Sequence, residues 1–343
     1  MYKVKRIILF VAVGIAANLM GQQADQVGAA SGFGARYATD AYPGFDADKD
    51  AFEPSRKEPK WFAFINGPEK GNAQDQFAYC KELEIGENWS KAVKHYDALV
   101  REWPSAPEAP AAQLRLAELL FEKENSLDDA LEEYRYLLDF YSFSCDYEAV
   151  ASRMYEVAKQ MEKEGKDILF FHFRNTVDVR RAFESCVLHA PGATWSPRAM
   201  LTIGKLREDE GKFSEAVAVY ENLRNLHYGS EEAKLGTVRE ALARGHILKD
   251  HSYNRSRCLD TADFLNMALT IVPEKYIPII KHQLDETNEL LENEAYKTAQ
   301  FYDSRMRTKR SAIAAYERFL EEYPESKYVE SVRSRLAEIK GSE

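Results

Sequence analysis

The chain has 343 residues, of which 45% are hydrophobic and 30% are charged, so most of it is expected to fold rather than to stay disordered. Its 46 basic and 56 acidic residues leave a formal net charge of −10. The sequence also lacks a Lys/Arg stripe with interleaved aromatic residues. Both features argue against a nucleic-acid partner, because phosphate binding needs a concentrated basic face.

The N-terminal segment has the order of a signal peptide. Three basic residues within the first six positions precede the uncharged run Ile7–Met20. As a helix this run would be about 21 Å long, shorter than the roughly 30 Å hydrocarbon core of a membrane. We therefore expect a signal peptide over residues 1–21, cleaved after Gly21, with a buried N-terminal helix as the alternative. The mature chain is then expected outside the cytoplasm, in a bacterial periplasm.

Residues 22–72 differ in composition from the C-terminal part of the chain. Many of the glycines and four of the 12 prolines lie at or before residue 72. This composition predicts a flexible leader. It contains one apolar island, Trp61–Ile65, which we expect to dock on the first helices rather than to act as a binding motif.

From residue 73 to residue 343 the pattern is helical. Apolar residues recur three and four positions apart, as in Ala92, Val93, Tyr96 and Leu99, and no run alternates with a period of two. Prolines are absent from the long intervals between the Pro104, Pro191, Pro273 and Pro324 groups, as helix interiors require. The sequence predicts an all-α domain.

This domain contains an internal repeat. The motif is a small residue, an aromatic residue four positions later, an apolar residue three further on, and a helix stop after another five. Six segments fit it, and the third and fifth are weaker copies. In chain order they are Ala92/Tyr96/Leu99, Ala130/Tyr134/Leu137, Val179/Phe183/Cys186, Ala216/Tyr220/Leu223, Thr261/Leu265/Ala268 and Ala312/Tyr316/Phe319.

The motif has a packing explanation. Two helices of a pair approach closely where a small residue lies, and the aromatic ring fills the gap to the next pair. Polar turns are expected upstream of four copies, at residues 86–88, 124–126, 164–166 and 210–212. Gly204 is expected at the crossing with Ala216, and Cys80 and Cys186 are expected to be small packing residues rather than reactive thiols.

This repeat resembles the tetratricopeptide repeat family. The resemblance implies a right-handed superhelical solenoid of about five to six helix pairs with a C-terminal capping helix. Residues 292–302 and 312–326 further resemble the closing repeat of the BamD family of outer-membrane-protein assembly lipoproteins, and Trp89–Pro107 resembles its first repeat boundary. One position departs from that family: Gln22 stands where the lipidated cysteine is found, so the chain is expected either to be soluble or to be held at the outer membrane by partners.

The resemblance implies a non-catalytic protein-binding scaffold. Its partners would be the POTRA domains of the barrel assembly subunit and unfolded outer-membrane proteins, with peripheral association with the outer membrane. The alternative is a generic periplasmic tetratricopeptide adaptor that serves envelope integrity, cell division or secretion. A helical accessory part of an envelope enzyme is less favoured, because only one helix is expected after Pro324.

By analogy with the family, the first helix of each pair lines a concave face that recognises protein. The candidate protein-binding residues are Phe77, Lys81 and Glu84 in the first pair and Arg198, Lys205 and Glu208 in the fourth. For each of them an ordinary solvated helix residue is the alternative. The seven histidines and four cysteines form no metal-binding motif, and no phosphate loop or nucleophile turn occurs, so we expect no metal, no cofactor and no enzymatic activity.

Overall fold

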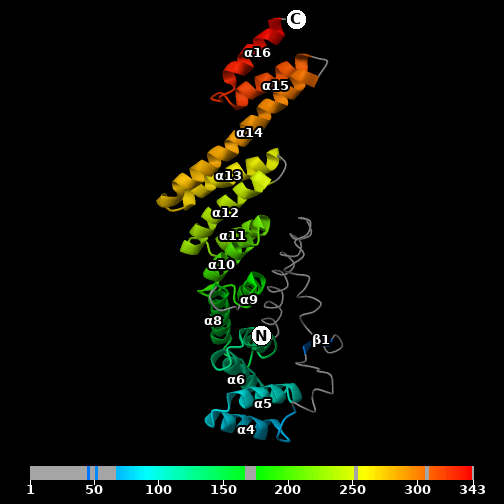
Figure 1. The fold of residues 1–343 in the computed structure, drawn as a ribbon, viewed down its shortest axis with the longest axis vertical. Helices are drawn as coiled ribbons and strands as arrows, with labels where there is room; N and C mark the ends of the chain where they lie inside the picture. The colour runs from blue at the N-terminus through cyan, green and yellow to red at the C-terminus, as the bar shows by residue number, and fades with distance from the viewer. Residues whose placement is uncertain are drawn as a thin grey trace, which may run out of the picture. The chain divides into compact units, whose positions relative to one another are not determined.

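The computed structural model describes residues 45–46, 51–52, 67–166, 175–250, 254–305 and 309–341 (Figure 1). The expected signal peptide and most of the expected leader lie outside these residues. Within residues 1–66, only β1 (Phe45–Asp46) and β2 (Ala51–Phe52) are described, as one antiparallel pair. The chain divides into two compact units between Ser196 and Pro197, and each is described by itself.

The first unit contains six described helices, in which each helix packs against the next along the chain. They are α4 (Ala73–Ile85), α5 (Trp89–Glu102), α6 (Ala109–Glu122), α7 (Leu127–Phe140), α8 (Tyr147–Lys166) and α9 (Thr176–His189). Asparagine side chains begin two of them: Asn72 accepts a hydrogen bond from the backbone of α4, and Asn175 does the same for α9.

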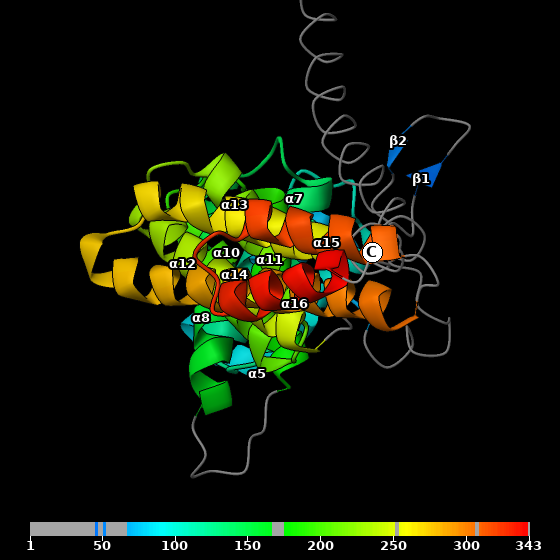
Figure 2. The ribbon, with the colours of Figure 1, turned by 90° about the horizontal axis from the view of Figure 1, so that it is seen from above.

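The second unit has seven described α-helices and one short 3-10 helix. They are α10 (Ser196–Asp209), α11 (Phe213–Leu226), α12 (Glu231–Asp250), α13 (Arg255–Ile271), η1 (Glu274–Tyr276), α14 (Ile277–Arg305), α15 (Lys309–Glu322) and α16 (Val329–Gly341). Helices α14, α15 and α16 lie side by side at the C-terminal end of this unit, as Figures 1 and 2 show together. The described helices therefore form six pairs and a last single helix, which confirms the predicted all-α repeat architecture.

The repeat motif marks the core. All 18 residues assigned to its small, aromatic and apolar positions are at most 3% exposed. The second helix of each pair thus turns the same three positions inward, as the spacing of four and three along a helix requires. The aromatic position holds Tyr96, Tyr134, Phe183, Tyr220, Leu265 and Tyr316 in the six pairs.

Three of the four expected turns are present. Glu87, Asn125 and Gly211 each have a positive φ (55°, 52° and 73°) at the equivalent point between the two helices of a pair. The turn expected at residues 164–166 is wrong, because helix α8 continues through Lys166. Helix α8 has 20 residues and includes these three positions.

The crossing of Gly204 with Ala216 stays a prediction, and the structure shows which side chain lies nearest to the glycine. A Cβ atom at Gly204 would lie 2.2 Å from the ring of Tyr220, so the glycine makes room for the aromatic residue of its own pair. Cys80 and Cys186 are fully buried, as predicted for packing residues. Burial raises the pKa of each thiol to about 12, which leaves it protonated and unreactive at neutral pH.

Candidate protein-binding site

The first three candidate residues lie together on α4. Phe77 is half-buried and meets the ring of Tyr96 edge-on, with 5.9 Å between the centroids. The ammonium group of the exposed Lys81 lies 4.3 Å above the centroid of Phe77. Glu84, one turn further along, is half-buried and accepts a hydrogen bond from the hydroxyl of Tyr96. Phe77 and Glu84 therefore take part in internal packing, and Lys81 keeps its charge at the surface.

The other three candidate residues lie on α10 in the second unit. Arg198 is exposed, while Lys205 and Glu208 are half-buried. Glu208 accepts a hydrogen bond from Tyr220 at 2.6 Å and is paired with Arg239. Arg198 and Lys205 are not part of this cluster.

Glu84 and Glu208 belong to a recurring arrangement, which we call the Tyr–carboxylate–Arg cluster. In the first pair, Tyr96 donates to Glu84 at 2.6 Å, and Arg115 from the next helix donates to the same carboxylate at 2.6 and 2.8 Å. Three consecutive helices, α4, α5 and α6, are thereby joined by one carboxylate. Such charge-assisted bonds are stronger than neutral ones.

The same cluster occurs twice in the second unit. There Arg239 of α12 donates to Glu208 at 2.8 Å and to the hydroxyl of Tyr220 at 3.2 Å. At the C-terminal end, Asp303 of α14 accepts from Tyr316 at 3.2 Å and from Arg335 at 2.7 and 3.1 Å. The cluster again joins a first helix, its second helix and the following helix.

Helices α6, α7 and α8 contain a weaker version. Glu122 and Arg153 occupy the equivalent positions, but their closest N–O distance is 3.5 Å and both side chains are more than a third exposed. The buried hydroxyl of Tyr134 has no hydrogen-bond partner among the described residues. In the two remaining pairs Phe183 and Leu265 take the aromatic position and have no hydroxyl group to donate.

The pairing keeps the carboxylates of Glu84 and Asp303 ionised. For Glu84, burial acts to raise the pKa, but hydrogen bonds from Arg115 and Tyr96 outweigh it and the pKa falls below its ordinary value. Hydrogen bonds from Arg335 lower the pKa of Asp303 against the opposing effect of burial. A carboxylate held ionised in this way is a poor proton donor at neutral pH, so the clusters suit structural support rather than acid–base chemistry.

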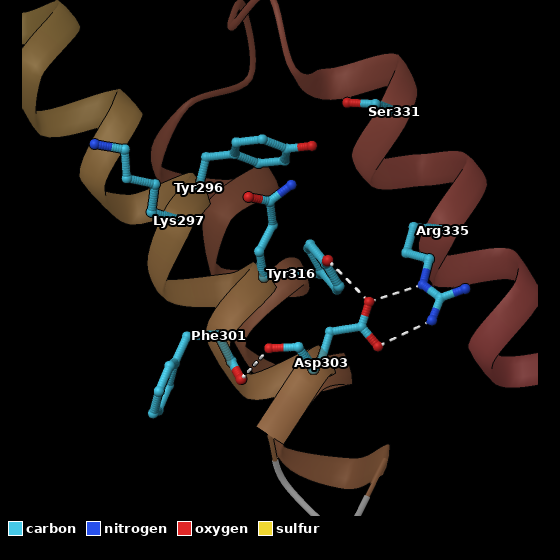
Figure 3. Close-up of a pocket in the computed structure, with 9 residues that line it drawn as sticks. Tyr296, Lys297, Phe301, Asp303, Tyr316, Ser331 and Arg335 are labelled. Carbon is cyan, nitrogen blue, oxygen red and sulfur yellow. Dashed lines mark hydrogen bonds and ion pairs between the residues drawn. The ribbon is translucent and has the colours of Figure 1, made fainter.

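A surface pocket lies beside the Asp303 cluster, between α14, α15 and α16 (Figure 3). Its volume is about 680 Å³. Tyr296, Phe301 and Tyr316 contribute aromatic rings to its lining, and Lys297 and Arg335 contribute positive charges. Phe301 is 51% exposed, which is unusual for so large an apolar side chain. None of the six candidate residues from the sequence lines this pocket.

The sequence contains a spacing pattern from which the Tyr–carboxylate–Arg clusters could have been predicted. Arg239 follows Tyr220 by 19 residues, and Arg115 and Arg335 follow their tyrosines at the same interval. The carboxylate precedes the tyrosine by 12 residues in two clusters and by 13 in the third. The pocket could not be found in this way, because it depends on the angles at which α14, α15 and α16 pack.

The part of the chain that the structure describes contains no group of three or more His, Cys, Asp or Glu side chains arranged to hold a metal ion. None of the described helices is both long and apolar enough to cross a membrane. His246 stacks on Phe213 at 4.6 Å, and His189 is hydrogen-bonded to Asp139 at 2.9 Å, so both histidines have packing roles. His172 and His251 lie outside the described residues.

Two segments match the sequence profiles of known families, both described as tetratricopeptide repeat: residues 86–144 and residues 295–326. The first spans α5, α6 and α7, and the second spans the end of α14 and α15. The fold is all-α and built of tetratricopeptide-like helix pairs, and these two segments match the tetratricopeptide repeat itself, a repeat that generally serves as a scaffold for protein interactions.

No curated protein sequence matches the chain significantly. Among solved structures, a tetratricopeptide repeat protein from Parabacteroides merdae is 12% identical, covers 78% of this chain and 98% of its own, and has a TM-score of 0.28. PilF of Pseudomonas aeruginosa is also 12% identical, with 77% and 97% covered and a TM-score of 0.26. The C-terminal part of a repeat protein from Cytophaga hutchinsonii is 15% identical, with 75% and 98% covered and a TM-score of 0.23.

Proposed function

We propose that the chain is a non-catalytic, exported scaffold that binds other proteins. The main supporting observation is which residues of the helix pairs are buried. The repeat positions pack inside the fold, and the outward positions of the helices remain available for recognition. A stack of helix pairs of this kind presents many side chains in fixed positions to a partner.

We further propose a BamD-like role in the assembly of outer-membrane β-barrel proteins. Support comes from the resemblance of residues 292–302 and 312–326 to the closing repeat of that family, a region that overlaps the second matched repeat segment. In this role the partners are the POTRA domains of the barrel assembly subunit and unfolded outer-membrane proteins. The chain would act in the periplasm, at the outer membrane through its partners.

A generic periplasmic adaptor for envelope integrity, cell division or secretion is the second candidate. Gln22 favours it, because a BamD protein has its lipidated cysteine at that position. Both candidates have the same repeat scaffold and differ in the partner that it binds.

The deciding experiment combines crosslinking in the native envelope with a direct binding measurement. The chain is crosslinked in its own cells and recovered, and its partners are identified by mass spectrometry. In parallel, the purified chain is titrated with the purified POTRA domains from the same cells. Recovery and saturable binding of the barrel subunit support the BamD-like role. Reproducible recovery of cell-wall or secretion proteins without that subunit would replace it by the adaptor role, and a chain that binds no protein in either assay would overturn the scaffold.

A further inference from the structure

Residues 67–72, which precede α4 and which we call the N-terminal strap, are tied to α5 through one buried side chain. Gln76 of α4 is fully buried. Its side-chain oxygen accepts hydrogen bonds from the backbone N–H groups of Glu69 and Lys70, both at 2.9 Å. Its side-chain nitrogen donates to the backbone oxygen of His95 at 3.2 Å. One amide group therefore joins the strap, α4 and α5, and it does so at His95.

The side chain of His95 is linked to the strap as well, through Tyr79 of α4. The rings of Tyr79 and His95 meet edge-on, with 5.1 Å between their centroids. The ammonium group of Lys70, on the strap, lies 4.8 Å from the centroid of Tyr79. An aromatic ring attracts a cation over its face, but a second positive charge beside the same ring is repelled by the first. A charged His95 would therefore repel the strap.

The two nitrogens of the His95 ring have different surroundings. Nδ1 is shielded from solvent and has no hydrogen-bond partner among the described residues, whereas Nε2 is not shielded in this way. A neutral imidazole carries one N–H group, and these surroundings assign its proton to Nε2. An imidazolium carries two N–H groups, so protonation of His95 in the folded chain would bury a donor that has no acceptor. Such an unsatisfied donor is costly.

The charges around His95 also oppose its protonation. Burial lowers the pKa of His95, and the positive charges of Lys94 and Lys91 on α5 act in the same direction. The negative charge of Glu69 on the strap acts against them without outweighing them. From α4, Tyr79 is the titratable side chain in contact with the ring.

The sign of the pH dependence follows from the lowered pKa. The ordinary pKa of histidine, 6.5, applies to His95 in the unfolded chain, and the folded value lies below it. The stability that depends on the neutral ring is therefore complete above pH 6.5. It falls as the pH decreases through 6.5, and it levels off below the lower pKa of the folded state.

From this arrangement we propose that the N-terminal strap is a pH-sensitive latch, which is released from α5 at mildly acid pH when His95 takes up a proton. Release exposes Nδ1 to water and separates the imidazolium from the ammonium group of Lys70. The proposal concerns the beginning of the first unit and does not depend on which protein the scaffold binds.

The test is hydrogen–deuterium exchange of the full chain at pH 7.5 and pH 5.5, measured by mass spectrometry. Protection is compared after correction for the direct effect of pH on the exchange chemistry. The amides of Glu69 and Lys70 and those of α4 should lose protection by about twofold or more in acid. The amides of α11, in the second unit, should keep theirs.

Three variants separate the latch from a general effect of acid. His95→Phe keeps an aromatic ring against Tyr79 but cannot take up a proton, so its strap should remain protected at pH 5.5. Lys70→Gln removes the charge that repels the imidazolium and should reduce the loss of protection. The matched control is His282→Gln, at a histidine whose side chain is 77% exposed, and it should behave like the wild-type chain.

The proposal is overturned if the wild-type strap is equally protected at both pH values, or if His95→Phe loses protection in acid as the wild-type chain does. Circular dichroism checks that each variant is folded. If His95→Phe does not fold, NMR titration of His95 in the wild-type chain decides instead. A pKa at or above 6.5 then overturns the latch, and a lower one supports it.

Discussion

Replacing Gly204 with alanine is expected to destabilise the fold, although alanine is the better helix former by about 1 kcal/mol. The added Cβ would lie 2.2 Å from Cε1 and 2.5 Å from Cζ of Tyr220. The ring has little freedom to move away, because it is fully buried and its hydroxyl donates to Glu208 at 2.6 Å. Overpacking a core costs about 1–3 kcal/mol, and a contact this short belongs above the middle of that range, so the net loss should be about 1–2 kcal/mol.

Urea unfolding followed by circular dichroism at 222 nm measures this loss. Gly236→Ala is the control with a milder clash and should cost less, because its Cβ would come closer than 3.0 Å to one atom alone, a terminal methyl group of Leu223 at 2.9 Å. In a Tyr220→Leu background the clash at residue 204 is removed, and alanine there should be neutral or stabilising. If Gly204→Ala stabilises the wild-type chain, or costs the same in both backgrounds, the close packing of glycine and ring is refuted.

Four further predictions concern single residues. Tyr316→Ala should cost about 3–5 kcal/mol of unfolding free energy, since the ring is 3% exposed, and a loss below about 1 kcal/mol in a urea melt would contradict the repeat register. Arg335 lowers the pKa of Asp303, so the stability that this pair contributes is present above pH 3.8 and is lost as the pH falls through the lower pKa of the folded state. Asp303→Asn removes this titration, so the unfolding free energy of the variant should fall less steeply with decreasing pH than that of the wild-type chain. Glu240 is fully buried between two arginines, and Glu240→Ala should cost about 3–5 kcal/mol in thermal unfolding, whereas a near-neutral effect would mean that the arginines find other partners. Cys80 should resist a thiol reagent in the native chain and react only after denaturation, and rapid native labelling would contradict its burial.

The helix pairs could be predicted from the sequence because their signal is periodic. Helical spacing places the small, aromatic and apolar positions on one face, and the same face must be buried in every pair. The sequence pattern predicts a turn inside α8, because Glu164, Gly165 and Lys166 resemble the turn residues of the other pairs. Helix α8 continues through them, since glycine near the end of a helix lowers its stability without stopping it.

Whether the candidate residues bind protein stays a prediction, and their contacts within the fold could not be predicted from the sequence, for a physical reason. Glu84 and Glu208 are candidates on sequence grounds because the first helix of a pair is expected to line the binding face. In the structure each one is drawn inward by a tyrosine hydroxyl and an arginine from neighbouring helices. Helical periodicity identifies the face of one helix, whereas these contacts join three helices and depend on their relative positions.

The Tyr–carboxylate–Arg clusters also limit where the chain can change its length during evolution. The 19 residues from Tyr220 to Arg239 cannot gain or lose one without separating the arginine from its carboxylate, and two other clusters keep the same interval. In the described structure, five of the six second helices have 14 residues, namely α5, α7, α9, α11 and α15. The first helices vary from 13 residues in α4 to 20 in α8 and 29 in α14. Insertions and deletions should therefore accumulate in the parts of the first helices that lie outside these intervals, and a designer who wishes to graft a segment onto this scaffold should place it there.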